Sequence, residues 1–255
     1  MTTEGITNMR ARPMGALTAF LIMTFGLAAT AQEFDHAHAA FDAVLKAHVT
    51  DGAVDYRAIK ADPAALNGYL DTLAAVREGE FKTWSKARQL AFYFNLYNAA
   101  TLKLIVDHYP LDSIKDIGHI FKGPWDQKVV RLFGETITLN NLEHDILRKD
   151  YNEPRLHMAL VCAAKGCPPL RSEAYVGKRL DAQLDDQSRG YLASPLGLQI
   201  DRAKGEARIS SIFKWYGGDF PSVRAFVEKH SGQSLKGLRI RYLDYDWRLN
   251  GKVEG

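Results

Sequence analysis

The two cysteines of the chain stand close together, in a place where a thiol could do covalent chemistry. Cys162 ends the apolar run HMALVC, and the segment AAKG separates it from Cys167. A loop that follows a rigid strand often carries functional groups. Because only the thiolate is nucleophilic, Cys162 needs a base or a positive charge beside it. With such a partner, the sequence predicts a thiol enzyme that hydrolyses an amide or ester or transfers its acyl group.

Two histidines that precede Cys162 are the candidate bases. His157 lies five residues before the cysteine in a predicted strand over 157–162, and an odd separation in a strand puts two side chains on opposite faces. His144 belongs to a predicted helix over 140–149 and has no such restriction. We therefore predict His144 as the catalytic base and His157 as its reserve.

Three further polar residues belong to the predicted site. Asn95 and Asn98 lie three apart, on one face of a predicted helix over 86–108 that is apolar nearly all round. Since buried amides need partners, either both tie neighbouring loops to the core or one of them faces the active site. In the active site, Asn95 would orient the histidine or bind substrate, and Asn98 would assist binding. Glu143 stands three residues after Asn140, an arrangement that fits either a helix capping box or a contact with substrate.

Other interpretations of the same residues stay open. Cys162 and Cys167 could form a disulfide, because four intervening residues in a loop with glycine and proline allow closure, and the chain would then be a non-catalytic binding domain. The two cysteines could also hold zinc together with His144 and His157, although C-x4-C is wider than the usual spacing. Both thiols could be inert buried side chains. We predict no metal and no cofactor, and a small molecule or peptide of unknown identity as the substrate.

The first thirty residues have the pattern of a secretory signal peptide. Arg10 and Arg12 precede an apolar run over 14–29, and Ala29-Thr30-Ala31 offers small residues at the cleavage site. We therefore predict a signal peptide over 1–31 and a periplasmic or secreted mature chain over 32–255. No later segment of the sequence is long and apolar enough to span a bilayer, and an exported chain meets oxidising conditions in which disulfides form.

The composition indicates an ordinary folded domain. The chain has 255 residues, of which 46% are hydrophobic and 25% charged, so it can bury a sizeable core without a metal or disulfide. The net charge of +3 is spread without a long basic run, which argues against nucleic-acid binding. We find no repeat and no internal linker and predict one domain, while the oligomeric state is left open.

The pattern of elements predicts an α+β fold, with helices interleaved with short antiparallel hairpins around a buried central helix. Short strands pair in two predicted hairpins, and Gly134-Glu135 indicates a type II′ turn in the first of them. The predicted helices are 34–48, 62–76, 86–108, 140–149, 178–193, 211–216 and 221–230, and the predicted strands are 128–133, 136–139, 157–162, 198–201, 207–210 and 238–243.

Several blocks in order resemble the DUF547 family. They are VDYRAI, AFYFNLYNAATLKLIV, LNNLEHDILR, PRLHMALVCAAKGCPPLRSEAY, ISSIFKWYGGDF and YDWRLN, and together they cover about residues 50–250. The family has no assigned function, so the resemblance implies the domain unit and not its activity. It also implies a polar signature made of Asn95, Asn98, Glu143, His144, His157 and Cys162.

The resemblance bears on the two cysteines as well. Family members from plants can have serine at the position of Cys167, which implies that a disulfide is not common to the family and favours a role for Cys162. A cysteine–histidine pair beside a polar helix is also similar to the papain and transglutaminase group. In those enzymes the cysteine usually precedes the histidine, whereas His144 and His157 both precede Cys162 here.

Overall fold

The computed structural model describes residues 1–2, 5, 33–119 and 122–252. Apart from residues 1–2 and 5, the signal peptide predicted for residues 1–31 lies outside these ranges. Residues 34–255 form one compact unit, separate from Met1–Glu33. Among the helices of the described ranges, none combines the length and the apolar character that a membrane crossing requires.

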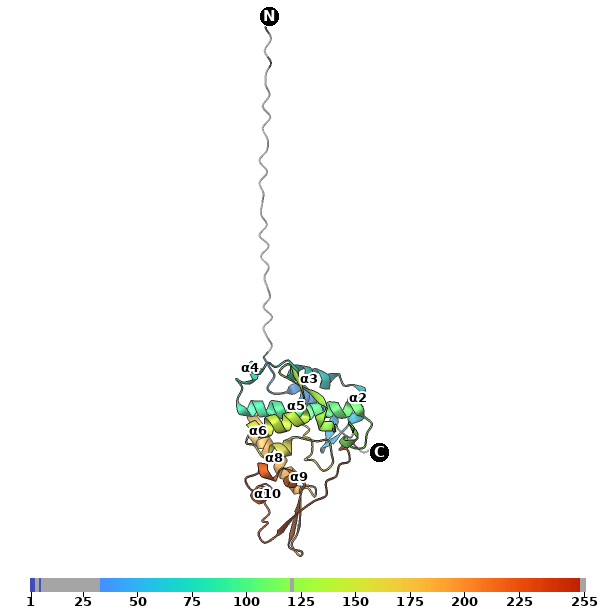
Figure 1. Cartoon of the computed structure of the whole chain (residues 1–255), viewed down its shortest axis with the longest axis vertical. Helices are drawn as coiled ribbons and strands as arrows, with labels where there is room; N and C mark the ends of the chain where they lie inside the picture. Colours follow the sequence, from blue (N-terminus) through green and yellow to red (C-terminus); the bar gives the residue numbers. More distant parts are fainter. Residues whose placement is uncertain (3–4, 6–32, 120–121, 253–255) are drawn as a thin grey trace. The chain divides into compact units, whose positions relative to one another are not determined.

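The centre of the compact unit is the helix α5, Lys86–His108, as the sequence predicted. The Ser85 side chain accepts a hydrogen bond from the backbone of Arg88 and caps its first turn. Sixteen of its 23 residues are buried, because other elements cover it on several sides. In Figure 1, α3 and α4 lie on one side of α5, and α6, α8, α9 and α10 lie on the other.

The N-terminal elements pack short helices against α5. Asp55 caps a helix at 56–61, and its side chain accepts a hydrogen bond from the backbone of Ala58. The elements before α5 are α1 Ala39–His48, β1 Val49–Thr50, β2 Ala53–Val54, α2 Tyr56–Ala61, α3 Ala64–Ala74 and α4 Glu78–Phe81. Strands β1 and β2 pair antiparallel.

The hairpin after α5 has a different turn from the predicted one. Short 3-10 turns at Ile114–Asp116 (η1) and Pro124–Asp126 (η2) lead into β3 Lys128–Leu132 and β4 Glu135–Thr138. Leu132 pairs with Glu135, so Phe133 and Gly134 form the turn, and both have positive φ. That is a type I′ turn, and the predicted type II′ turn at Gly134-Glu135 is wrong because β4 already begins at Glu135.

The strand predicted over 157–162 is also wrong. Residues Leu156–Ala159 form the short helix α7, and Leu160 to Cys162 continue without a strand partner. Every residue of α7 is buried, and a short, fully buried apolar run does not distinguish helix from strand by its periodicity. The argument that His157 and Cys162 point to opposite faces therefore loses its basis.

The helix predicted at 140–149 is wound more loosely than an α-helix. Residues Asn141–Leu147 (η3) form a π-helix, and α6 follows at Arg148–Asp150. π-Helices are rare in proteins, and those that occur often lie at functional sites. Because each turn holds more residues than an α-helical turn, neighbours along the chain project in more similar directions, and the consecutive residues Glu143 and His144 line the same pocket.

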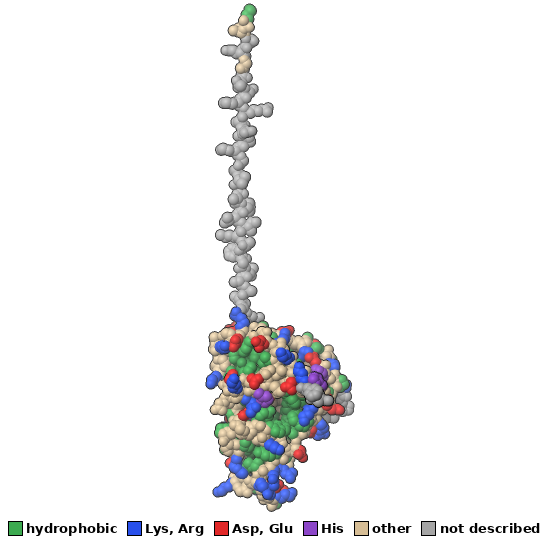
Figure 2. Space-filling view, in the orientation of Figure 1, with side chains coloured by type: hydrophobic (Ala, Val, Ile, Leu, Met, Phe, Trp, Pro, Cys, Tyr) green, Lys and Arg blue, Asp and Glu red, His purple; other side chains and the backbone are tan. Residues whose placement is uncertain are grey.

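The C-terminal part forms a second core around a small sheet. Strands β5 and β6 pair antiparallel, and β7 pairs with β6 in parallel. The elements are η4 Gly177–Arg179, α8 Leu180–Ala193, β5 Leu198–Asp201, β6 Glu206–Ile209, α9 Ile212–Trp215, η5 Gly217–Asp219, α10 Val223–Ser231 and β7 Arg239–Tyr242. The fold is α+β, as predicted. This sheet forms one end of the compact unit in Figure 1. Lys and Arg side chains gather at the same end in Figure 2.

Candidate functional site

A pocket of about 270 Å³ brings together several of the predicted site residues. Glu143, His144, His157, Cys162 and Cys167 all line it. Aromatic side chains make up much of its wall, and they are Tyr97, Trp125, Trp215, Tyr216, Tyr245 and Trp247. A concave, mostly apolar site with a few polar groups is the usual form of a small-molecule pocket.

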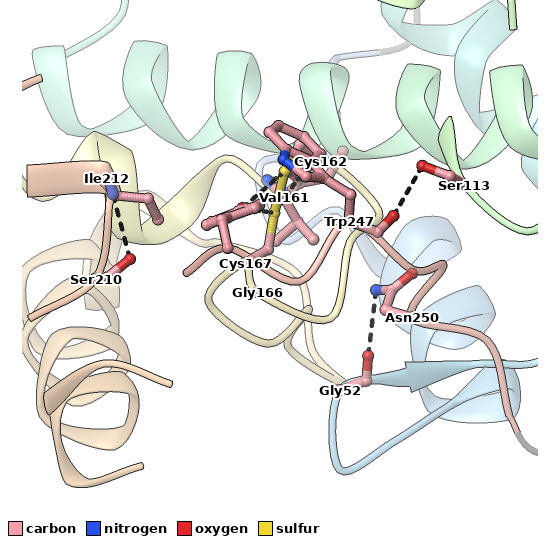
Figure 3. Close-up of a disulfide and its surroundings, with 12 residues drawn as sticks. Gly52, Ser113, Val161, Cys162, Gly166, Cys167, Ser210, Ile212, Trp247 and Asn250 are labelled. Carbon is pink, nitrogen blue, oxygen red and sulfur yellow. Dashed lines mark hydrogen bonds between the residues drawn. A yellow bond between two sulfur atoms is a disulfide. The ribbon is translucent and has the colours of Figure 1, made fainter. Parts of the chain in front are cut away.

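The two cysteines of the pocket are joined by a disulfide, with 6.3 Å between their Cα atoms (Figure 3). Cys167 is only 5% exposed, whereas Cys162 is partly buried. The hydroxyl of Tyr245 lies 3.1 Å from the sulfur of Cys162 and 3.0 Å from that of Cys167, so its single proton is shared between the two sulfurs. The backbone N–H of Cys162 donates a further bond of 3.1 Å to the Cys167 sulfur.

The loop that carries the disulfide is fastened to the C-terminal segment 245–250. Lys165 donates its backbone N–H to the carbonyl of Arg248, and Gly166 donates to Asp246, both at 2.8 Å. Asn250 donates in return to the carbonyl of Ala163 at 3.0 Å. A side chain at Gly166 would collide with the backbone of Asp246, so the close approach of the two segments requires glycine there.

Glu143 is a buried carboxyl group in the wall of the pocket. Tyr97 donates a hydrogen bond of 3.2 Å to it, and the Tyr216 hydroxyl also hydrogen-bonds to it. Burial raises the pKa of Glu143, although His144 and these hydrogen bonds act against the rise. Relative to an exposed carboxyl group, burial thus shifts Glu143 toward its protonated form, and in that form it can donate a hydrogen bond.

His144 has one ring nitrogen already engaged. Arg148 Nη1 lies 2.9 Å from its Nδ1, and because an arginine can only donate, that nitrogen must accept. With Nδ1 as the acceptor, the ring N–H of His144 lies on Nε2. In this arrangement His144 can offer an N–H to a ligand, while its Nδ1 is already engaged by Arg148.

His157 is held by Asp219 rather than by the cysteine. Its Nε2 lies 2.7 Å from Asp219 Oδ2, and its ring stacks on Tyr216 with 4.1 Å between centroids. Burial lowers the pKa of His157 to about 4, so the neutral ring donates to the carboxylate. Asp219 also accepts two hydrogen bonds from Arg148, at 2.6 and 2.9 Å, and its pKa is lowered to about 2 chiefly by that arginine.

The predicted nucleophile and base are thus in one pocket but not paired. Among the residues that the structure describes, no hydrogen bond joins the Cys162 sulfur to either imidazole. The sulfur contacts Tyr245 and Cys167, while His144 is hydrogen-bonded to Arg148 and His157 to Asp219. The pairing of Cys162 with His144 stays a prediction that would need the disulfide to open and the His144 ring to change partner.

The two asparagines of α5 tie other segments to the core. Asn95 donates to the carbonyl of Tyr175 at 2.8 Å and accepts from its N–H at 2.9 Å. Asn98 does the same for the carbonyl of Ala159 and the N–H of Val161, at 3.0 and 2.9 Å. Neither lines the pocket. The structure gives Asn95 this structural role in place of orienting a histidine, and Asn98 positions the segment that leads to Cys162.

No metal cluster emerges from the same side chains. Within the described ranges, no group of three or more His, Cys, Asp or Glu residues is arranged so that it could hold a metal ion. The zinc site considered from the sequence would need both cysteine sulfurs as separate ligands, whereas here they are bonded to each other.

Several residues of the site were missed in the sequence. Asp219, Tyr216 and Tyr245 follow Cys162 by more than fifty residues, in segments without regular secondary structure of useful length. The signal available was compositional: the blocks WYGGDF and YLDYDW concentrate aromatic and acidic residues near the C-terminus. Arg148 could have been found from its position four residues after His144 on one predicted helix.

Comparison with known proteins identifies one family that matches part of the chain. Searches of curated proteins and of solved structures each found no match. The model of one family, described as DUF547, protein of unknown function, matches residues 81–192. That range begins in α4, contains all of α5 and the disulfide, and ends within α8. The segments 212–219 and 245–250, which complete the site, lie beyond it. The chain therefore contains a DUF547 domain, as its sequence blocks indicated.

Proposed function

We propose that this domain binds a neutral small molecule or peptide in the aromatic pocket, through an amide or ester carbonyl. The observation that supports the proposal is the combination of aromatic walls with two side chains that can donate a hydrogen bond, His144 through its Nε2–H and Glu143 when it is protonated. A carbonyl oxygen is the acceptor that such donors match. The two cysteines form part of the wall, and we propose that the ligand binds while the disulfide between them is closed.

The charges behind the walls favour a neutral ligand over a cation. Lys115 Nζ lies 3.8 Å from the centroid of the Trp247 ring, and the Arg148 guanidinium lies 5.0 Å from that of Tyr216. Cations are attracted to aromatic faces, but two of these rings already have one beside them. A second cation would meet electrostatic repulsion, while an apolar or amide group stacks without it.

Removal of Trp215 tests the proposed pocket. Trp215 is 46% exposed, stacks on Trp247 at 5.8 Å and contributes to the pocket wall. Trp215→Ala is expected to weaken binding of N-acetylphenylalanine amide about 5- to 10-fold, because one aromatic contact is worth about 1 kcal/mol. Isothermal titration calorimetry checks this result.

The control variant is Tyr242→Ala, since Tyr242 is similarly exposed at 45% and is not part of the pocket wall. It should bind like the unmodified protein. Phenylalanine amide, which has a free cationic amine in place of the acetylated one, is the matched charged probe. Equal or tighter binding of this amine, or equal weakening by both variants, would contradict the proposal.

A second candidate function is that of a Cys162-dependent hydrolase or acyltransferase. The observation in its favour is that Cys162 lines the same pocket, so its thiol would lie beside a bound carbonyl once the disulfide is reduced. Reduced protein is then expected to hydrolyse p-nitrophenyl acetate, and Cys162→Ser to lose that activity. Equal rates before and after reduction, or full activity in Cys162→Ser, would leave only the binding function.

We also propose that the domain works in the periplasm or outside the cell. The argument is the sequence pattern of residues 1–31, which is typical of a secretory signal. An oxidising compartment would also favour the closed disulfide.

A further inference from the structure

The disulfide lies where a small molecule can reach it. Both cysteines line the 270 Å³ pocket, and Cys162 is the more exposed of the two. A disulfide that only cross-links a loop gains nothing from facing a pocket. Thiol–disulfide exchange, by contrast, depends on which sulfur an attacking thiolate can reach and on how well the other sulfur leaves.

The surroundings of Cys167 suit a leaving thiolate. The Tyr245 hydroxyl at 3.0 Å and the backbone N–H of Cys162 at 3.1 Å both direct hydrogens at its sulfur. Burial raises the pKa of Tyr245 well above its usual value, so the hydroxyl stays a donor at any physiological pH. Hydrogen bonds to a charged acceptor are stronger than those to a neutral one, so these two contacts stabilise the thiolate more than the disulfide.

The loop does not depend on the disulfide for its shape. Three backbone hydrogen bonds hold residues 163–166 against the segment 245–250, and Tyr191 donates a further bond of 2.7 Å to the carbonyl of Gly166. None of these hydrogen bonds involves a sulfur atom, so opening the disulfide removes none of their donors or acceptors. The reduced loop would therefore keep both sulfurs near each other and ready to close again.

From these observations we infer that the Cys162–Cys167 disulfide is a thiol–disulfide exchange centre for small thiols that enter the pocket. The thiolate of the small molecule attacks the Cys162 sulfur, the bond between the two cysteines breaks, and its electron pair goes to the Cys167 sulfur. A second small thiolate attacks the sulfur of the first in the mixed disulfide and releases the Cys162 thiolate. Both cysteine thiolates can then take protons from water. Two small thiols are thereby oxidised to one disulfide, and the protein disulfide is reduced to two thiols.

The order of attack is tested with single-cysteine variants of the full domain and glutathione disulfide as the probe. In Cys167→Ser the remaining Cys162 should form a mixed disulfide with glutathione within minutes, detected by mass spectrometry. In Cys162→Ser the buried Cys167 should react at least tenfold more slowly in the absence of denaturant. Faster reaction at Cys167, or reaction of either variant only after denaturant is added, would overturn the inference.

The role of Tyr245 is tested with the intact disulfide. Reduction of the native protein by 2-mercaptoethanol, followed by counting of free thiols, should be about tenfold slower in Tyr245→Phe, because the leaving thiolate loses one donor. Tyr242→Phe removes an exposed hydroxyl of the same kind and should leave the rate unchanged. Far-UV circular dichroism shows whether each variant is folded, and an unchanged rate in a folded Tyr245→Phe would contradict the role.

This inference does not rest on the proposed function. Both properties are measured on the unmodified domain, exchange by its reduction with 2-mercaptoethanol and binding by calorimetric titration with N-acetylphenylalanine amide. Exchange without binding would contradict the proposed function alone. Binding without exchange would contradict the inferred exchange centre alone.

Discussion

Replacement of Asn95 by alanine is expected to lower the free energy of unfolding by about 3–4 kcal/mol. The Asn95 side chain is 1% exposed and satisfies both the carbonyl and the N–H of Tyr175. Without it, two buried backbone groups lose their partners, and each orphaned group costs about 1–3 kcal/mol. Urea unfolding followed by tryptophan fluorescence measures the difference, and at this size the melting temperature should fall by roughly 8–14 °C.

A matched control for this variant exists on α3. The side-chain oxygen of Asn67 has no hydrogen-bond partner among the described residues, and alanine has the higher helix propensity. Asn67→Ala should therefore be neutral or slightly stabilising. A loss of less than 1 kcal/mol in Asn95→Ala would mean that water or a backbone shift satisfies Tyr175 once the amide is gone.

Stability is expected to fall as the pH is lowered from about 6.5 to 4, with His157 contributing roughly 3 kcal/mol of the loss. Its pKa is about 4 in the folded protein, because burial disfavours the charged ring, against an ordinary value of 6.5 in the unfolded chain. Between these values the unfolded chain binds a proton that the folded protein does not, so acid favours unfolding. The stabilisation is complete above pH 6.5 and is lost as the pH falls toward 4.

The variant His157→Gln separates this contribution from the others. It removes the titrating ring but can still donate to Asp219, so it should flatten the pH dependence of the unfolding free energy between 6.5 and 4.5. His38, whose pKa burial also lowers to about 4, should keep its own share of the slope. The carboxylates Asp219 and Glu173, with pKa values lowered to about 2, lose their stabilisation mainly below this window. An unchanged slope in His157→Gln would contradict the assignment.

The sequence predicted those elements whose pattern is local and long. The helix α5 was predicted with its observed bounds because no stretch of 23 residues so apolar can face water. The segment at 157–162 was predicted wrongly because four buried residues carry no periodicity. The turn at Phe133 depended on a strand register that the sequence does not display.

The site was predictable only in part, for a related reason. Glu143, His144, His157 and both cysteines were found because their residue types suggest chemistry, and they do meet in one pocket. What each of them does depends on neighbours from distant segments: Asp219 holds His157, and Tyr245 contacts both sulfurs. Such pairings arise from the folded arrangement of loops, which spacing along the chain does not encode.

The attachment of the disulfide loop to the segment 245–250 has a consequence for biosynthesis. Tyr245 and Trp247 supply part of the pocket wall, and they follow Cys162 by more than eighty residues along the chain. A ribosome still translating the region before them has already released α5 and the cysteines, yet it has not produced the wall that faces them. The pocket can therefore be completed only after residues 245–250 have been made.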